Sequence, residues 1–335
     1  MKKSLTVETL SNGLKVYLKE IHTAPIISSW LWYRVGSRDE VQGRTGISHW
    51  VEHMQFKGTP QFPASILDKA ISREGGTWNA MTYLDWTAYF ETMPADRINL
   101  ALRLEADRMV NSQFDEKEVA SERTVIISER EGNENEPLFQ LGEAVQQAAF
   151  RIHPYHHEVI GDMADLHSMT RDDLYDHYRA FYVPNNAVMA VAGDFDTASM
   201  LARVRELFEP IPAGREPARL ARPETEQSGE LRLSVEGPGA TSYVQVCYRF
   251  PAASHPDFFP LSVLDSLLAA GCLVDLLVSQ TARIVAKQEL DLSLPSGSAE
   301  LVAGLRARNP QHPGEPRAYG RDEWSAPAAS GSNPA

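Results

Sequence analysis

The chain has 335 residues, a length that suits two domains, and it carries a formal net charge of −13 with an apolar fraction typical of soluble proteins. This acidity argues against nucleic acid but permits attraction of basic peptides. The chain also contains no run long enough to span a membrane and no secretory signal, so we expect a cytoplasmic protein. Because its only cysteines are Cys247 and Cys272, neither a disulfide framework nor a cysteine-based zinc site is expected.

The first 220 residues mix predicted strands and helices. Asn12-Gly13 predicts a hairpin turn between strands over 5–9 and 14–18. Thr170 is a predicted N-cap, with Asp173 at the N3 position of its helix. The other predicted elements are a buried strand over 24–37, a β-rich stretch over 77–93, a strand over 186–195, and helices over 64–76, 95–111, 115–131, 137–150, 170–182 and 197–208. This pattern predicts an α+β fold, a mainly antiparallel sheet packed by helices.

The remainder of the chain repeats this pattern only in part. Strand, strand and helix are predicted over 231–237, 242–250 and 260–271, the same order as at the N-terminus. The stretch 271–297 could form one helix, and the Pro/Gly/Ser/Ala-rich residues after it are expected to be disordered. We therefore predict one full domain and a truncated second copy, with boundaries at 1–211 for the first domain, 212–229 for a linker, 230–270 for the partial domain and 271–335 for the tail.

The stretch ISHWVEHMQFKGT, residues 47–59, combines apolar and proton-active side chains. A helix can begin at Thr45 or Gly46 and continue to about Phe56. Its apolar side chains recur at i, i+4 and i+7, so we expect one stripe to face the core, formed by Ile47, Val51 and Met54.

His49 and His53 lie one helical turn apart, on another face of this helix. Two neutral imidazoles at this spacing can chelate a divalent metal, and Glu52 lies beside them without having to bind it. A carboxylate in that place can accept a proton from metal-bound water. This is the H-x-x-E-H arrangement of inverted zincins. The alternative is a solvated helix face with two ordinary histidines.

A catalytic zinc needs a third protein ligand, and the helix over 115–131 offers two candidates. Glu122 and Glu129 are two turns apart on one face, with Val125 and Ile126 between them. A carboxylate on an apolar face needs a partner such as a metal, because burying it alone is costly. An exposed acidic helix is the alternative, and spacing alone does not distinguish Glu122 from Glu129.

In combination, these motifs resemble the M16 family of zinc metallopeptidases, which includes pitrilysin, insulysin and the mitochondrial processing peptidase. The likeness is to short bacterial members, extends over about 5–270, and implies the processing-peptidase-like metallohydrolase fold. Its landmarks, in chain order, are GISHWVEHMQFKGTP, GGTWNAMTYLDWTAYFETMP, ERTVIISERE, HPYHHEVIG and YVPNNAVMAVAGDFD.

The resemblance implies a role for each candidate. At the family's spacing from the second histidine, the third zinc ligand falls on Glu129, and a supporting glutamate that orients a ligand falls on Glu122. By the same carry-over, His49 and His53 bind zinc and Glu52 is the general base.

The resemblance also implies that Asn79 and Ala80 receive the substrate as an added strand. An ordinary edge strand is the alternative. A second histidine cluster, His153, His156 and His157, is interpreted as loop residues or neighbours of the site rather than as ligands, because the ligand set is already complete.

The function implied is a zinc-dependent endopeptidase acting on peptides or unfolded segments. Family members have two homologous halves that close over the substrate, and the Arg-Tyr pair of their second half has no clear counterpart here. We therefore expect truncation or a shifted reading frame after about residue 270. A second copy or a second M16-like subunit would supply the missing wall, with no nucleic-acid or membrane partner. The alternative is a non-catalytic or weakly active peptide-binding subunit.

Overall fold

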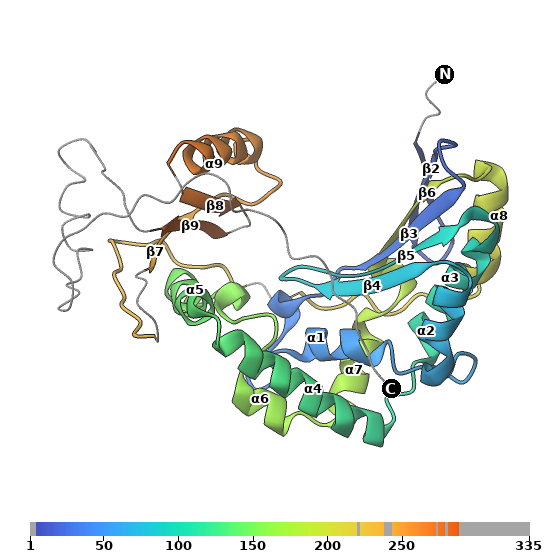
Figure 1. Ribbon diagram of the computed structural model, residues 1–335, viewed down its shortest axis with the longest axis horizontal. Helices are drawn as coiled ribbons and strands as arrows, with labels where there is room; N and C mark the ends of the chain where they lie inside the picture. The colour runs from blue at the N-terminus through green and yellow to red at the C-terminus, as the bar shows by residue number, and fades with distance from the viewer. Residues whose placement is uncertain (1–4, 220–221, 238–242, 273, 279–280, 288–335) are drawn as a thin grey trace, which may run out of the picture. The chain divides into compact units, whose positions relative to one another are not determined.

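The computed structural model describes residues 5–219, 222–237, 243–272, 274–278 and 281–287. Its main feature is a six-stranded sheet with the strand order β1-β2-β6-β3-β5-β4 (Figure 1). All neighbouring strands are antiparallel except β2 and β6, which are parallel. The strands are β1 (Thr6–Thr9), β2 (Lys15–Glu20), β3 (Ile26–Tyr33), β4 (Thr77–Thr82), β5 (Thr87–Pro94) and β6 (Ala187–Gly193). The predicted α+β fold with a mainly antiparallel sheet is confirmed.

Helices complete this part of the fold. They are α1 (Ile47–Met54), α2 (Ala64–Arg73), α3 (Ile98–Asn111), α4 (Glu116–Glu134), α5 (Pro137–Ala149), α6 (Met163–Ser168), α7 (Arg171–Phe181) and α8 (Thr197–Phe208). Short 3₁₀ turns occur at Ser37–Asp39, Ala95–Arg97, Pro154–His156 and Pro184–Asn186. Sequence periodicity did not predict α6. None of the helices in the described ranges is both long and apolar enough to cross a membrane.

The predicted Asn12-Gly13 turn and the predicted Thr170 cap are both present in the structure. The β1–β2 turn contains Gly13 at a φ of 90°, and the side chain of Asn12 accepts the Leu14 N–H. The predicted capping box of α7 is present, because Thr170 and Asp173 exchange side-chain and backbone hydrogen bonds. These are contacts between near neighbours in the chain, which explains why the sequence predicts them.

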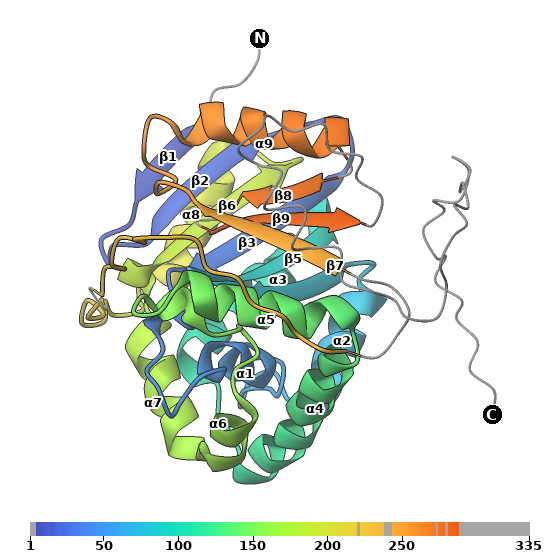
Figure 2. The same cartoon turned by 90° about the vertical axis from the view of Figure 1, so that its left-hand side faces the viewer.

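The packing places α1 at the centre of the helical layer. Helices α2, α3 and α8 cover one side of the sheet, whereas α1 lies among α4, α6 and α7 and also contacts β4 and β5 (Figures 1 and 2). Ile47, Val51 and Met54 are buried in the main core, as the stripe predicted. The apolar face of α1 is therefore fixed, and its histidine face is turned toward β4 and α4.

The second half differs from the prediction in two places. Strand β7 (Tyr243–Arg249) and helix α9 (Phe258–Cys272) form as expected, but 231–237 is not a strand. Its alternating Leu231, Leu233 and Val235 are exposed, because no strand in the described residues pairs with them.

The single helix predicted over 271–297 is also wrong in its described part. Strands β8 (Val274–Val278) and β9 (Thr281–Lys287) form there and join β7 in a second sheet of order β7-β9-β8. Short apolar runs of this kind suit either a helix or a strand, and hydrogen bonding to β7 favours the strand. The expected disorder of the tail lies outside the described residues from 288 onward, and the proposed domain division stays a prediction.

Candidate metal centre

The site is built on α1, whose N-cap is Gly46 in the left-handed region at a φ of 85°. A side chain there would collide with the carbonyl oxygen of Ile160, so glycine suits this position both in conformation and in space. The helix that follows presents His49 and His53 on one face, with their ring centroids 4.6 Å apart. The predicted pairing of the two imidazoles is therefore present.

Glu129 of α4 completes a group of three potential metal ligands. The Nε2 atoms of His49 and His53 are 3.3 Å apart, and the Glu129 carboxylate oxygens lie 3.8 Å from His49 Nε2 and 3.7 Å from His53 Nε2. Donor atoms bound to a tetrahedral zinc at about 2.0–2.1 Å lie about 3.4 Å from one another. The two Glu129 distances belong to different carboxylate oxygens, Oε1 toward His49 and Oε2 toward His53. Because this side chain is 42% exposed, it has room to turn one oxygen toward both imidazoles. The three residues therefore fit a tetrahedral metal with one open position.

Glu122 has a different place on the same helix. Its carboxylate lies 2.8 Å from His53 Nδ1 and also pairs with Lys57. A carboxylate on Nδ1 keeps the proton there and leaves the Nε2 lone pair free toward His49 and Glu129. Of the residues between the two glutamates, Ile126 is buried and Val125 is 49% exposed, so the apolar part of this helix face is formed by Ile126.

The two histidines differ in their electrostatics. Burial and then the neighbouring His53 lower the pKa of His49 to about 3. Burial would also lower the pKa of His53, but its hydrogen bond to Glu122 and the nearby carboxylates outweigh this and raise it. His49 is therefore neutral, which a metal-binding imidazole must be.

Glu52 faces the same space without joining the ligand group. It is 8% exposed, and Thr82 Oγ1 of β4 donates a hydrogen bond of 2.7 Å to its Oε2. Burial raises the pKa of Glu52, although the bond from Thr82 and the charge of His53 act in the opposite direction. A carboxylate with a raised pKa is a better proton acceptor near neutral pH than an ordinary one.

These groups open onto a pocket of about 430 Å³. Its lining also includes Glu158, Val159 and Ile160, which periodicity did not identify, although the HPYHHEVIG landmark contains them. Neither His153 nor His156 lines this pocket, and His157 bonds to Glu40 instead of the ligand group. The remaining lining residues are His49, Glu52, His53, Ala80, Met81, Thr82, Glu129, Asn133 and Phe139.

Strand β4 brings a sheet edge to the pocket, because it is the last strand in the order and, among the strands that the structure describes, pairs with β5 alone. The Tyr83 N–H donates to Trp86 O at the hairpin turn, which makes these two residues a hydrogen-bonded pair. In an antiparallel pair such positions alternate, so the backbone groups of Met81 and Asn79 are bonded to β5, whereas those of the residues between them point to the other edge. Ala80 therefore presents its N–H and C=O to that edge, whereas the backbone of Asn79 points toward β5. The side chain of Asn79 accepts the Ala80 N–H at 2.9 Å.

Two family models match this chain. The model described as insulinase, peptidase family M16, matches residues 15–163, which contain the entire candidate ligand group. The model described as the peptidase M16 inactive domain matches residues 168–299, so the match continues past residue 270, where the resemblance was expected to end.

Individual relatives agree with these models. The chain is 33% identical over 276 residues to zinc protease PqqE of Helicobacter pylori, covering 78% of this chain and 60% of that protein. It is 27% identical over 267 residues to a probable mitochondrial-processing peptidase subunit beta of Arabidopsis thaliana, covering 79% of this chain and 50% of that protein. The crystal structure of a protease from Helicobacter pylori superposes with a TM-score of 0.80 at 28% identity, covering 90% of this chain and 79% of that one. The chain thus spans about 60% of the length of PqqE.

Proposed function

Because this chain belongs to peptidase family M16, the insulinase family, we propose that it is a zinc-dependent endopeptidase that cleaves peptides or unfolded segments. The observation that carries the proposal is the convergence of His49, His53 and Glu129, whose ligand atoms lie within 4.8 Å of one another, with a buried carboxylate on the same pocket. We further propose that zinc, the metal named for its relatives, is the ion held there.

The roles of the residues follow from their contacts. The chemistry that zinc supplies when bound is the acidification of a water molecule, toward a pKa of about 7, and the polarisation of a carbonyl oxygen. Glu52 accepts the proton of the attacking water and later delivers it to the leaving amine. Thr82 orients Glu52 through their hydrogen bond, and Glu122 orients His53. Burial of Glu52 keeps bulk water from competing for its proton.

The edge of β4 that faces away from β5 is the proposed site of peptide binding. An extended peptide added there would pair with the outward N–H and C=O of Ala80 and would lie along the pocket. It would first displace the Asn79 side chain from the Ala80 N–H. Asn79 therefore takes part through its side chain, whereas Ala80 takes part through its backbone.

Replacing Ala80 with Pro should weaken peptide binding without unfolding the protein. Proline removes an N–H that β5 does not use, and an edge strand tolerates this. We expect KM to rise about fivefold, the effect of one lost backbone hydrogen bond, with zinc content unchanged. Met81→Pro is the matched control, because it removes an N–H that faces β5 and should lower thermal stability. An unchanged KM in A80P would contradict binding at this edge.

A partner is part of the proposal, since one relative is named as a subunit and the second half matches an inactive-domain model. The same observations favour the second candidate function, a peptide-binding subunit with little activity of its own. Zinc analysis combined with turnover of a quenched fluorescent peptide tests both candidates. We expect about one zinc per chain, weak turnover by the isolated chain, and faster turnover when a second M16-like subunit supplies the other wall. Bound zinc with no turnover under either condition would favour the binding subunit, and rapid turnover by the proven monomer would remove the need for a partner.

A further inference from the structure

Glu40 serves as the cap of α1 from outside the helix. Gly46, the N-cap residue, has no side chain to accept the free N–H groups of the first turn. The Glu40 carboxylate does so instead, with Oε2 accepting the Gly46 N–H and Oε1 accepting the Ser48 N–H, both at 2.8 Å. Glu40 is 4% exposed, and a negative charge at this end also suits the helix dipole.

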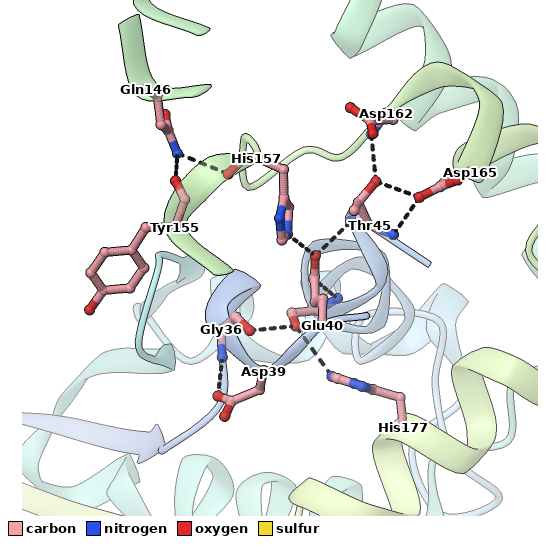
Figure 3. A network of polar contacts seen from close by, with 12 residues as sticks. Gly36, Asp39, Glu40, Thr45, Gln146, Tyr155, His157, Asp162, Asp165 and His177 are labelled. Carbon is pink, nitrogen blue, oxygen red and sulfur yellow. Dashed lines mark hydrogen bonds and ion pairs between the residues drawn. The ribbon is translucent and has the colours of Figure 1, made fainter. Parts of the chain in front are cut away.

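His157 holds Glu40 in this place. Its Nε2 lies 2.9 Å from Glu40 Oε2, and both side chains are buried (Figure 3). Burial alone would lower the pKa of His157, but the hydrogen bond and charge of Glu40 outweigh this and raise it. The buried carboxylate thus has three donors, two from the first turn of α1 and one from the loop that follows Pro154–His156.

The loop that carries His157 and the start of helix α6 after it are joined to the start of α1 at further points. Asp165 accepts both the N–H and the hydroxyl of Thr45, at 2.9 and 2.7 Å, and the Asp162 N–H donates to the Thr45 hydroxyl (Figure 3). The backbones of Gly46 and Ile160 also come too close for a side chain to fit between them. The same loop forms a wall of the metal pocket.

Ser48, the residue before His49, is held from the other side. Its hydroxyl donates to Gly36 O and lies 3.2 Å from His177 Nε2. Because the hydroxyl proton is used on Gly36, His177 must be the donor, with its proton on Nε2. Burial lowers the pKa of His177 to about 3, which keeps it neutral.

The two metal-binding histidines therefore depend on different supports. Glu122 holds the ring of His53 through Nδ1. The buried Nδ1 of His49 has no hydrogen-bond partner among the described residues. His49 is the third residue of α1, so its imidazole is placed by the backbone of the first turn and by packing, without a carboxylate or carbonyl to orient it.

We propose that Glu40 and His157 are positioning residues of the metal centre, which hold the first turn of α1 and thereby set His49 against His53 and Glu129. This rests on the proposed function, that zinc binds at these three residues. Zinc ligands tolerate deviations of only about 0.2 Å, so a loosened first turn weakens the site even when every ligand remains. The pair touches neither the reacting atoms nor the metal.

Zinc affinity of three variants, measured by competition with a chelator, tests the proposal. His157→Leu removes the donor to Glu40 and should weaken zinc binding about tenfold, the usual effect of losing such an indirect support. His157→Gln keeps an N–H donor and should stay within about threefold of the wild type. His22→Leu is the matched control and should leave zinc affinity unchanged, because His22 pairs with Asp194 at an exposed site, 2.6 Å away.

The outcomes distinguish failure of the positioning role from failure of the proposed zinc site. If H157L binds zinc as tightly as the wild type while His53→Ala does not, the positioning role is overturned and the metal site stands. If H53A itself retains full zinc affinity, the assigned metal site fails and the positioning role fails with it. Equal zinc affinity of H157L and H157Q also overturns the proposal. It would show that the hydrogen bond donated to Glu40 makes no difference, and that position 157 acts only by filling space. Should H157L fail to fold, Glu40→Gln provides the same test, and unchanged zinc affinity in E40Q would refute it.

Discussion

Glu52→Gln is expected to lower peptide turnover by about three orders of magnitude while the protein keeps its zinc. Glutamine has nearly the same size and can still accept the Thr82 hydroxyl, so the pocket keeps its shape. What it loses is the ability to accept a proton from water, and no ligand of the metal centre is altered. The measurement is single-turnover cleavage of a quenched fluorescent peptide, with the zinc content of the same sample determined in parallel.

Thr82→Val provides the control for Glu52→Gln. It removes the hydrogen bond that helps to lower the pKa of Glu52 but leaves the carboxylate in place. Its effect on turnover should therefore be much smaller, about tenfold, the scale of one lost hydrogen bond to a charged group. If E52Q instead retains both zinc and turnover, another residue is the base, and Glu122 is the next candidate.

His53→Ala is expected to abolish tight zinc binding. The substitution removes one of the three protein ligands. It also removes the contact of Glu122 with the metal centre, because among the described contacts Glu122 reaches a ligand through His53 Nδ1 alone. Two ligands on separate helices, His49 on α1 and Glu129 on α4, do not hold zinc against a chelator. Metal analysis after dialysis against a chelator measures this directly.

Glu122→Gln is the matched variant for His53→Ala. All three ligands remain, and the amide oxygen can still accept the His53 Nδ1–H, but the negative charge is lost. We expect zinc affinity to fall about tenfold, between the wild type and H53A. Unchanged zinc content in H53A would mean that the metal is held elsewhere, and an E122Q variant as deficient as H53A would make Glu122 a ligand in its own right.

The sequence alone determined the features that depend on near neighbours in the chain. His49 and His53 share a face because they are one helical turn apart, and the stripe of Ile47, Val51 and Met54 turns that face away from the core. The Asn12-Gly13 turn and the Thr170 cap also follow from local hydrogen bonds. The family landmarks added Glu129 to this set by comparison, which spacing within one helix could not do.

Only the tertiary structure decided features that depend on contacts between distant segments. Glu122 and Glu129 have the same periodicity, and they differ because the packing of α4 against α1 places one on His53 Nδ1 and the other beside both Nε2 atoms.

The capping of α1 by Glu40 and His157 joins residues 117 positions apart, and no local pattern predicts it. Likewise, 231–237 has the alternation of a strand but no partner in the described structure, whereas 274–278 and 281–287 become strands because β7 is available to the hairpin that they form. A strand forms only when backbone hydrogen bonds from another segment are in place, so the topology decides what composition leaves open.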